Sequence, residues 1–236
     1  MSGDEISPFF EKIWGNWSTE SGPCFECPNR DSQCRFYPKY GEGVLDADIA
    51  FVAETPNEDR RNQNSPKSRK DRNGKFEIIV RSNPVPGWIK DGNRISDSFF
   101  KQISADFTDE RDRGIYYTNI KKCADIGGGR AGWKNRKAKI HCEQYLEDEL
   151  LAVGPDIVVA FGEEATESLF EIFDAGPSFD TMKDGVLRVY QLDAYSVIPS
   201  FHWSYLHLNL RCLDNIDDQD EYWNKLAEVI NSATDV

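Results

Sequence analysis

The 236-residue sequence lacks any uncharged apolar run of about 18 residues, which is the length that a membrane-spanning helix needs. Its first residues include Asp4 and Glu5, where a secretory signal carries basic side chains followed by a long apolar stretch. These two absences predict a soluble, cytoplasmic protein with no membrane partner. The sequence also lacks an internal repeat and a clear linker, so we expect residues 1–236 to form a single domain.

Basic residues are scarce relative to acidic ones. The chain has 28 Lys and Arg against 41 Asp and Glu, a net charge of -13, and such a chain repels a polyanion at long range. Residues 60–75 and 121–139 nevertheless hold seven basic residues each. This segregation predicts either two local anion-contacting segments on an acidic body or two solvated loops. The acidic excess also fits the high-salt cytoplasm of a halophile.

The clearest structural signal is a set of short apolar runs, each continuous rather than alternating, as is typical of strands buried on both faces of a parallel sheet. The runs lie at residues 48–53, 115–119, 156–161 and 196–201. Helical patterns lie at residues 137–153, 163–173 and 221–232, and an additional edge strand is expected at 186–192. This alternation predicts a three-layer α/β/α sandwich with a short, mainly parallel central sheet. Ligands of such a fold gather beyond the carboxyl ends of the strands.

Helix 137–153 has the best-defined pattern, with a Gly154-Pro155 stop just beyond it. We expect one apolar stripe of this helix to be buried. The stripe consists of Ile140, Tyr145, Leu146, Leu150 and Leu151. Outside the regular elements, we expect an N-terminal cysteine arm at about residues 20–40 and a long basic insertion at about residues 60–87.

Six cysteines in a compartment that keeps thiols reduced favour metal ligation over disulfides. The candidate ligands, a C-x-x-C pair and two distant residues, are Cys24, Cys27, Cys123 and Cys142. Four thiolates suit tetrahedral zinc or a 4Fe-4S cluster, and the spacing does not choose between them. The remaining interpretation is that these cysteines bind no metal and are buried separately as small apolar residues. We expect Cys34 and Cys212 in the core, although Cys34 could replace one ligand.

Three segments coincide with predicted strand ends: FVAETPNED at residues 51–59, YYTNIKKC at 116–123 and FHWSYLHLN at 201–209. Together with the four cysteines they resemble, in the same order, the motifs of the uracil-DNA glycosylase superfamily, and specifically its iron-sulfur members, often called family four. The resemblance spans about residues 24–212. It implies a 4Fe-4S cluster, with zinc as the alternative, in a monomeric base excision repair enzyme. Such an enzyme hydrolyses the N-glycosidic bond of uracil, or of another deaminated base, in DNA.

The sequence departs from that family at several points. Residues 53–57 lack both glycines and the central alanine of the first motif, and Trp203 stands where the third motif has proline. The family's Gly-x-Pro-Phe-x-Gly segment has its nearest counterpart at residues 87–92. The choice of base therefore stays open between uracil and a deaminated purine such as hypoxanthine. A non-catalytic iron-sulfur protein that binds damaged or single-stranded DNA is the alternative function.

Breaking an N-glycosidic bond in DNA requires an extruded base, a positioned water and stabilisation of the departing base. Glu54 is a carboxylate suited to orienting water and opposing sugar charge, or it is a helix N-terminal carboxylate. His202 can donate to charge developing on a base carbonyl, or it is a packing or surface residue. The planar amide of Asn119 matches an adjacent carbonyl and N–H of uracil, or it is a strand-end turn residue.

The remaining candidates would contact the substrate or the DNA duplex. By resemblance, Pro56 and Ser204 belong to the substrate-binding motifs. Tyr205 and Leu206 would either wedge into the duplex or belong to the core. The glycine-rich loop that begins at Gly127 lacks the Gly-Lys-Ser/Thr ending of a nucleotide-binding loop, so contact with the DNA backbone is the better interpretation of its basic residues. They are Arg130, Lys134 and Arg136.

Overall fold

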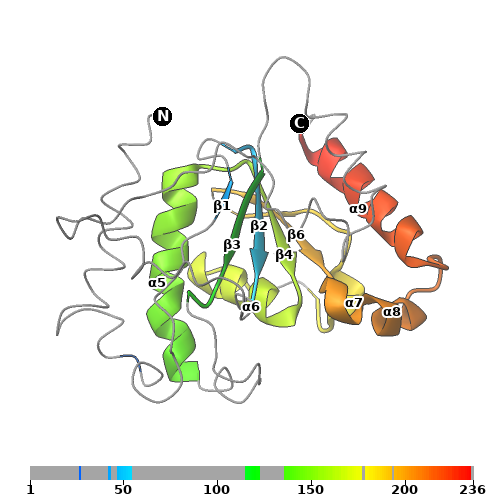
Figure 1. The fold of residues 1–236 in the computed structure, drawn as a ribbon, viewed down its shortest axis with the longest axis horizontal. Coiled ribbons are helices and arrows are strands. Elements are labelled where there is room, and N and C mark those ends of the chain that lie inside the picture. The colour runs from blue at the N-terminus through cyan, green and yellow to red at the C-terminus, as the bar shows by residue number, and fades with distance from the viewer. Residues whose placement is uncertain are drawn as a thin grey trace, which may run out of the picture.

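The computed structural model describes residues 27, 42–43, 47–54, 115–122, 136–176, 179–192 and 194–234. Within these residues, six strands form one sheet in the order β1-β3-β2-β4-β6-β5, with helices on both sides (Figure 1). The strands are β1 (Glu42–Gly43), β2 (Ile49–Ala53), β3 (Ile115–Asn119), β4 (Ile157–Phe161), β5 (Tyr190–Gln191) and β6 (Ser196–Ser200).

The centre of the sheet is parallel. Strands β3, β2, β4 and β6 pair in parallel, while β1 and β5 add to the two edges antiparallel. Every residue of β2 and β4 is buried, because helices cover both faces of these strands. The predicted short, mainly parallel central sheet is therefore confirmed, with its continuous apolar runs in the middle.

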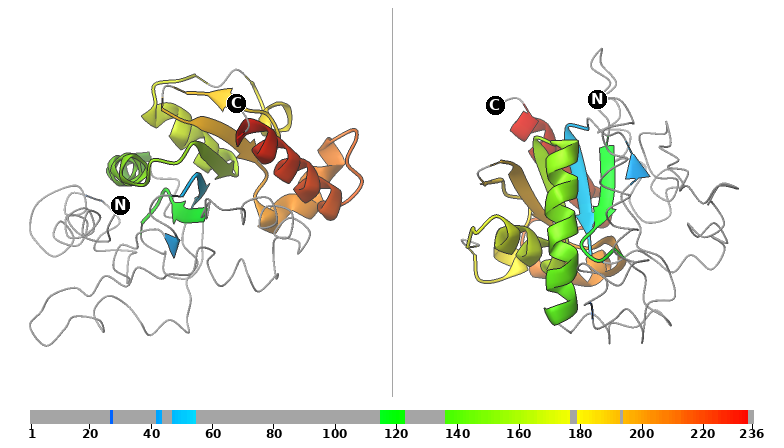
Figure 2. Two further views of the ribbon diagram at one scale, coloured as in Figure 1. Left: turned by 90° about the horizontal axis from the view of Figure 1, so that it is seen from above. Right: turned by 90° about the vertical axis from the view of Figure 1, so that its left-hand side faces the viewer.

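Helices cover both faces of the sheet. Helices α5 (Arg136–Val153) and α6 (Glu163–Ile172) pack on one face, and α9 (Gln219–Thr234) packs on the other (Figure 2). Successive strand residues point to opposite faces, so Val52 joins the core under α5 and α6, whereas Phe51 joins the core under α9. The short helices are α7 (Met182–Gly185) and α8 (Leu206–Asn209), and the 3-10 turns are η2 (Trp203–Tyr205) and η3 (Leu210–Cys212). The three-layer α/β/α architecture is confirmed.

Helix α5 differs in part from its predicted stripe. Tyr145, Leu146 and Leu150 are buried, but Ile140 and Leu151 are 51% and 59% exposed. The prediction was wrong for these two residues because they lie 11 positions, about three turns, apart on the outer side of the helix. The helix ends as predicted: Gly154, with φ 66°, donates its N–H to the Leu150 carbonyl at 2.8 Å.

Other predictions concern segments around this framework. The predicted edge strand at 186–192 is shorter than expected, since only Tyr190–Gln191 forms a strand beside β6. The predicted insertion at 60–87 and all of the cysteine arm except residue 27 lie outside the described residues. Among the helices of the described ranges, none is long and apolar enough to cross a membrane.

Candidate functional site

The carboxyl ends of the parallel strands form one edge of the sheet. A single row of paired residues marks it: Asn119 on β3, Ala53 on β2, Phe161 on β4 and Ser200 on β6. Adjacent strands lie about 4.8 Å apart. Glu54 follows Ala53 directly, and His202 comes two residues after Ser200. The structure thus brings Asn119, Glu54 and the His202 loop to the same edge.

The pairing of β2 with β3 continues past this row. The N–H of Ile120 donates to the Ala53 carbonyl at 2.8 Å, and the N–H of Lys121 donates to the Glu54 carbonyl at 3.0 Å. The backbone of Glu54 is therefore held by the same ladder that positions Asn119. Both side chains are half-buried, as expected for groups at the border between core and solvent.

Gly162 separates Glu54 from His202. Its φ of 93° and ψ of 167° lie in a region that is essentially restricted to glycine. A Cβ at this position would lie 3.5 Å from the Cβ of His202, so His202 lies over the end of β4. Because β4 is the immediate neighbour of β2, His202 and Glu54 flank Gly162.

Helix α9 fixes the chain just before His202. The N–H of Phe201 donates to the Tyr222 hydroxyl at 2.8 Å, and the Ser200 hydroxyl lies 3.1 Å from the same oxygen. The Phe201 ring also stacks on Tyr222. Burial raises the pKa of Tyr222 far above its usual range, so the phenol stays neutral and keeps its proton. The position of His202 thus depends on a buried hydroxyl 20 residues further along the chain.

Removing that hydroxyl should loosen this anchor. We expect Tyr222→Phe to lower the free energy of unfolding by about 1–3 kcal/mol, because the buried N–H of Phe201 loses its acceptor. Urea denaturation measures the effect. Tyr190→Phe, a half-buried tyrosine on the edge strand, is the matched control and should change stability less. If both variants lost the same free energy of unfolding, the hydrogen bond from Phe201 to Tyr222 would make no specific contribution to stability.

Aromatic side chains pack against the ring of His202 on its core side. Its ring lies 4.0 Å from the ring of Trp203, with an angle of 31° between the planes. Trp203 is buried and packs edge-on against Phe161 at 5.1 Å. The sequence marked Trp203 only as a departure from the family's proline. The structure shows that the Trp203 ring lies between the imidazole of His202 and the aromatic core under α9.

The segment after His202 exposes two apolar side chains. Tyr205 is 45% exposed, with its ring 6.3 Å from that of His202, and Leu208 is 48% exposed. Leu206 is completely buried. Of the two alternatives left open by the sequence, burial therefore favours the core for Leu206, and exposure favours the surface for Tyr205. Leu208 was missed, because a helix of four residues gives no periodic signal.

Strand β3 makes a polar contact at its carboxyl end. The Tyr117 hydroxyl donates to Oδ1 of Asn119 at 3.0 Å. The two residues are two positions apart, so they share one face of the strand. Sequence analysis missed Tyr117, since nothing in the pattern distinguishes it from a packing tyrosine.

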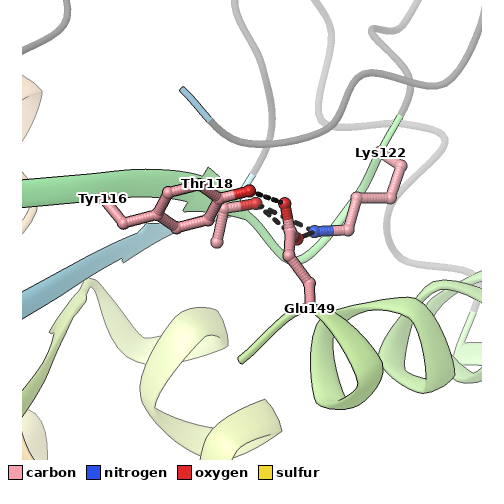
Figure 3. Close-up of polar contacts among 4 residues, drawn as sticks. All are labelled: Tyr116, Thr118, Lys122 and Glu149. Atoms are coloured by element: carbon pink, nitrogen blue, oxygen red, sulfur yellow. Dashed lines mark hydrogen bonds and ion pairs between the residues drawn. The ribbon is translucent and has the colours of Figure 1, made fainter. Parts of the chain in front are cut away.

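The other face of β3 is tied to α5 by a buried polar cluster, which we call the Glu149 cluster (Figure 3). Tyr116 and Thr118 donate to the two carboxylate oxygens of Glu149 at 2.5 and 2.8 Å. Lys122 forms an ion pair with Glu149 and donates to the Thr118 hydroxyl at 2.9 Å. All four side chains are at most 2% exposed. The cluster therefore fixes both β3 and the three residues after it against α5.

Several lysines of the predicted basic segment at 121–139 face inward. Lys121, Lys122 and Lys139 are buried, so both alternatives for this segment, contact with an anion and a solvated loop, are wrong for these three residues. Their neighbours explain it: Lys122 pairs with Glu149, and Lys139 lies 3.7 Å from Glu143. Arg130, Lys134, the side chain of Arg136 and all of residues 60–75 lie outside the described residues.

Glu143 gives this region a pH dependence. Burial raises the pKa of Glu143, and the attraction of Lys139 only partly opposes the effect. A raised carboxyl pKa favours the protonated form in the folded state, so its stabilising contribution is present at low pH and is lost as pH rises through the raised pKa. We expect Glu143→Gln to raise stability by about 1 kcal/mol at neutral pH and by less near pH 4, measured by denaturant titration. A destabilised variant at neutral pH would contradict this, and exposed Glu147→Gln is the control.

The described residues contain part of the predicted cysteine set. Cys142 is buried on α5 and Cys27 is half-buried, while Cys24, Cys123 and Cys34 lie outside the described ranges. Cys212 is exposed in η3, so the expectation that it belongs to the core was wrong: its turn lies at the surface. In the described ranges, no group of three or more His, Cys, Asp or Glu could hold a metal ion. Pro56 and the side chain of Ser204 also lie outside the description.

Comparison with protein-family models identifies a superfamily. A family model described as the uracil DNA glycosylase superfamily matches residues 40–227. The matched range contains all six strands and the residues Glu54, Asn119 and His202. No curated protein matches the chain.

Proposed function

Because the chain belongs to the uracil DNA glycosylase superfamily, whose members act on DNA, we propose that it is a DNA repair glycosylase that hydrolyses the N-glycosidic bond of uracil or another deaminated base. One observation supports the proposal: the positions that carry a carboxylate, an amide and an imidazole lie along one edge of the sheet, each at a different strand end. Open α/β sheets bind ligands at this edge.

Each side chain meets one demand of the reaction. Glu54 orients the attacking water and opposes the positive charge that develops on the sugar. His202 donates a hydrogen bond to the departing base and stabilises its negative charge. Asn119 reads the edge of the extruded base with its amide. Pro56 and Ser204, from the neighbouring motif positions, would add to the base-binding site.

The surface beside these three residues would contact the DNA. Tyr205, whose ring lies 6.3 Å from that of His202, and Leu208 on α8 expose apolar surface, and such side chains can fill the gap that an extruded base leaves in the duplex. Arg130, Lys134 and Arg136 would contact the phosphates on either side. Because the net charge is -13, these local contacts must overcome the repulsion of the whole chain.

The four cysteines would hold a 4Fe-4S cluster, with zinc as the alternative. Two features suit this donor set. Cys142 is buried on α5, seven residues before Glu149 and so on the same side of the helix. Lys122, which the Glu149 cluster holds against that helix, directly precedes Cys123 in the chain. A cluster ligated by Cys24, Cys27, Cys123 and Cys142 would staple the N-terminal arm to the β3–α5 connection. Metal analysis of the purified protein distinguishes iron from zinc.

Base release from oligonucleotides tests the proposal. Single strands and duplexes carrying one uracil, hypoxanthine or thymine would be incubated with excess protein in high salt, and abasic sites would be revealed by alkali. We expect release of uracil or hypoxanthine and none of thymine. Glu54→Gln, prepared identically, controls for contaminating glycosylases. Tight binding of the damaged strands without any release would favour the alternative, a non-catalytic DNA-damage or single-strand binding protein.

A further inference from the structure

We infer that Tyr117 determines which class of base the pocket accepts, because its hydroxyl sets the orientation of the Asn119 amide. The inference rests on the proposed function, in which Asn119 reads the base. It concerns a residue that does not itself need to contact the substrate, so Tyr117 is a positioning residue.

The contact is well supported by its surroundings. The Tyr117 hydroxyl donates to Oδ1 of Asn119 at 3.0 Å, and the Tyr117 ring packs against the core under α9. On the opposite face of the strand, Tyr116 and Thr118 are fixed to Glu149 (Figure 3). Contacts on both faces thus hold strand β3 and fix the backbone from which Asn119 extends.

The orientation of the amide has chemical consequences. An amide oxygen has two lone pairs, and the amide nitrogen has two N–H donors. With one lone pair of Oδ1 bound by Tyr117, the Asn119 amide still offers the second lone pair and an Nδ2–H side by side. This pattern complements an adjacent N–H and carbonyl, which occur together in uracil and hypoxanthine.

Cytosine and adenine present the reverse pattern, a ring nitrogen acceptor beside an amino donor. Pairing with them requires the Asn119 amide to turn over, so that Nδ2 faces Tyr117. The phenol would then have to accept from Nδ2–H instead of donating to Oδ1, and a phenol oxygen is a weaker acceptor than its O–H is a donor. Tyr117 therefore favours deaminated bases over the normal bases from which they arise, whatever the ring size.

The variant Tyr117→Phe tests this directly, because it keeps the ring and removes only the hydroxyl. We expect the ratio of kcat/KM for uracil over cytosine in matched oligonucleotides to fall about threefold, the lower end of the value of one neutral hydrogen bond, because the hydroxyl changes from donor to acceptor rather than losing its partner. We also expect kcat on uracil to fall by a few-fold with little change in KM, since phosphate contacts dominate DNA affinity. A purely structural role would lower the melting temperature and leave the uracil-to-cytosine ratio unchanged.

Two controls sharpen the result. Tyr190→Phe removes the hydroxyl of a half-buried tyrosine on the edge strand β5, which has no role in the proposed site, and should keep the wild-type ratio. In an Asn119→Ala background, Tyr117→Phe should have no further effect, because the residue through which it acts is gone. If the wild type releases uracil and Tyr117→Phe keeps the wild-type ratio, the inference is overturned while the proposed function stands. If the wild type releases no base at all, the proposed function fails and this inference fails with it.

Discussion

The variant His202→Ala is expected to release uracil about 100- to 1000-fold more slowly than the wild type in single-turnover assays. The departing base carries negative charge in the transition state, and a preorganised donor stabilises that charge more than it stabilises the bound substrate. His202 is preorganised: Trp203 lies under its ring, and Tyr222 holds the preceding peptide. The loss should therefore appear in kcat rather than in DNA affinity.

His207 provides the matched control for this effect. It is an exposed histidine on α8, five residues from His202, and His207→Ala should keep nearly the wild-type rate. A full rate in His202→Ala would remove the imidazole from the reaction. An equal loss in both variants would point to a general effect on DNA binding instead.

The variant Glu149→Gln is expected to lower the free energy of unfolding by about 3–5 kcal/mol. Glutamine has nearly the same volume, but it removes the negative charge that compensates the fully buried Lys122. It also replaces a carboxylate oxygen, which accepts from Tyr116 or Thr118, with an amide nitrogen that cannot accept. A typical domain has only about 5–15 kcal/mol of stability, so the variant should unfold at much lower denaturant concentration.

Two further variants separate charge from packing in the Glu149 cluster. Glu147→Gln changes an exposed carboxylate on the same helix and should alter stability by less than about 0.5 kcal/mol. The double variant Lys122→Met/Glu149→Gln removes both charges but keeps an amide oxygen as acceptor, and it should recover the part of the loss that the uncompensated charge of Lys122 causes. A Glu149→Gln variant as stable as the wild type would show that the Lys122 charge is compensated elsewhere.

Much of the fold could be predicted because burial and chain direction leave strong local signals. The continuous apolar runs of β2 and β4 indicated strands covered on both faces, and Gly154 indicated the end of α5. The shared edge of Glu54, Asn119 and His202 could be predicted because the carboxyl ends of parallel strands lie along one edge of the sheet, where ligands bind. These features depend on a few consecutive residues, which a sequence displays directly.

What could not be predicted depends on contacts between distant residues. Lys122 and Glu149 are 27 positions apart, and Lys and Glu are residue types that usually lie at the surface. The Tyr222 anchor and the Trp203 ring under His202 likewise arise only when α9 and β6 pack together. The local contact between Tyr117 and Asn119 was missed for a different reason, since it depends on side-chain direction at the strand end.

The response of the histidine imidazoles to DNA tests the location of the site most directly. The chain has only 3 histidines, so NMR can resolve the signals of each ring. The Trp203 ring, 4.0 Å away, should move the chemical shifts of His202 away from those of the other two. Two otherwise identical oligonucleotides would be compared, one with thymidine and one with 2′-fluoro-2′-deoxyuridine, a uracil nucleotide that resists hydrolysis. We expect the His202 signals to differ between the two complexes, because the uracil lies against His202 in only one of them. Identical His202 signals in both, with both strands bound, would contradict it.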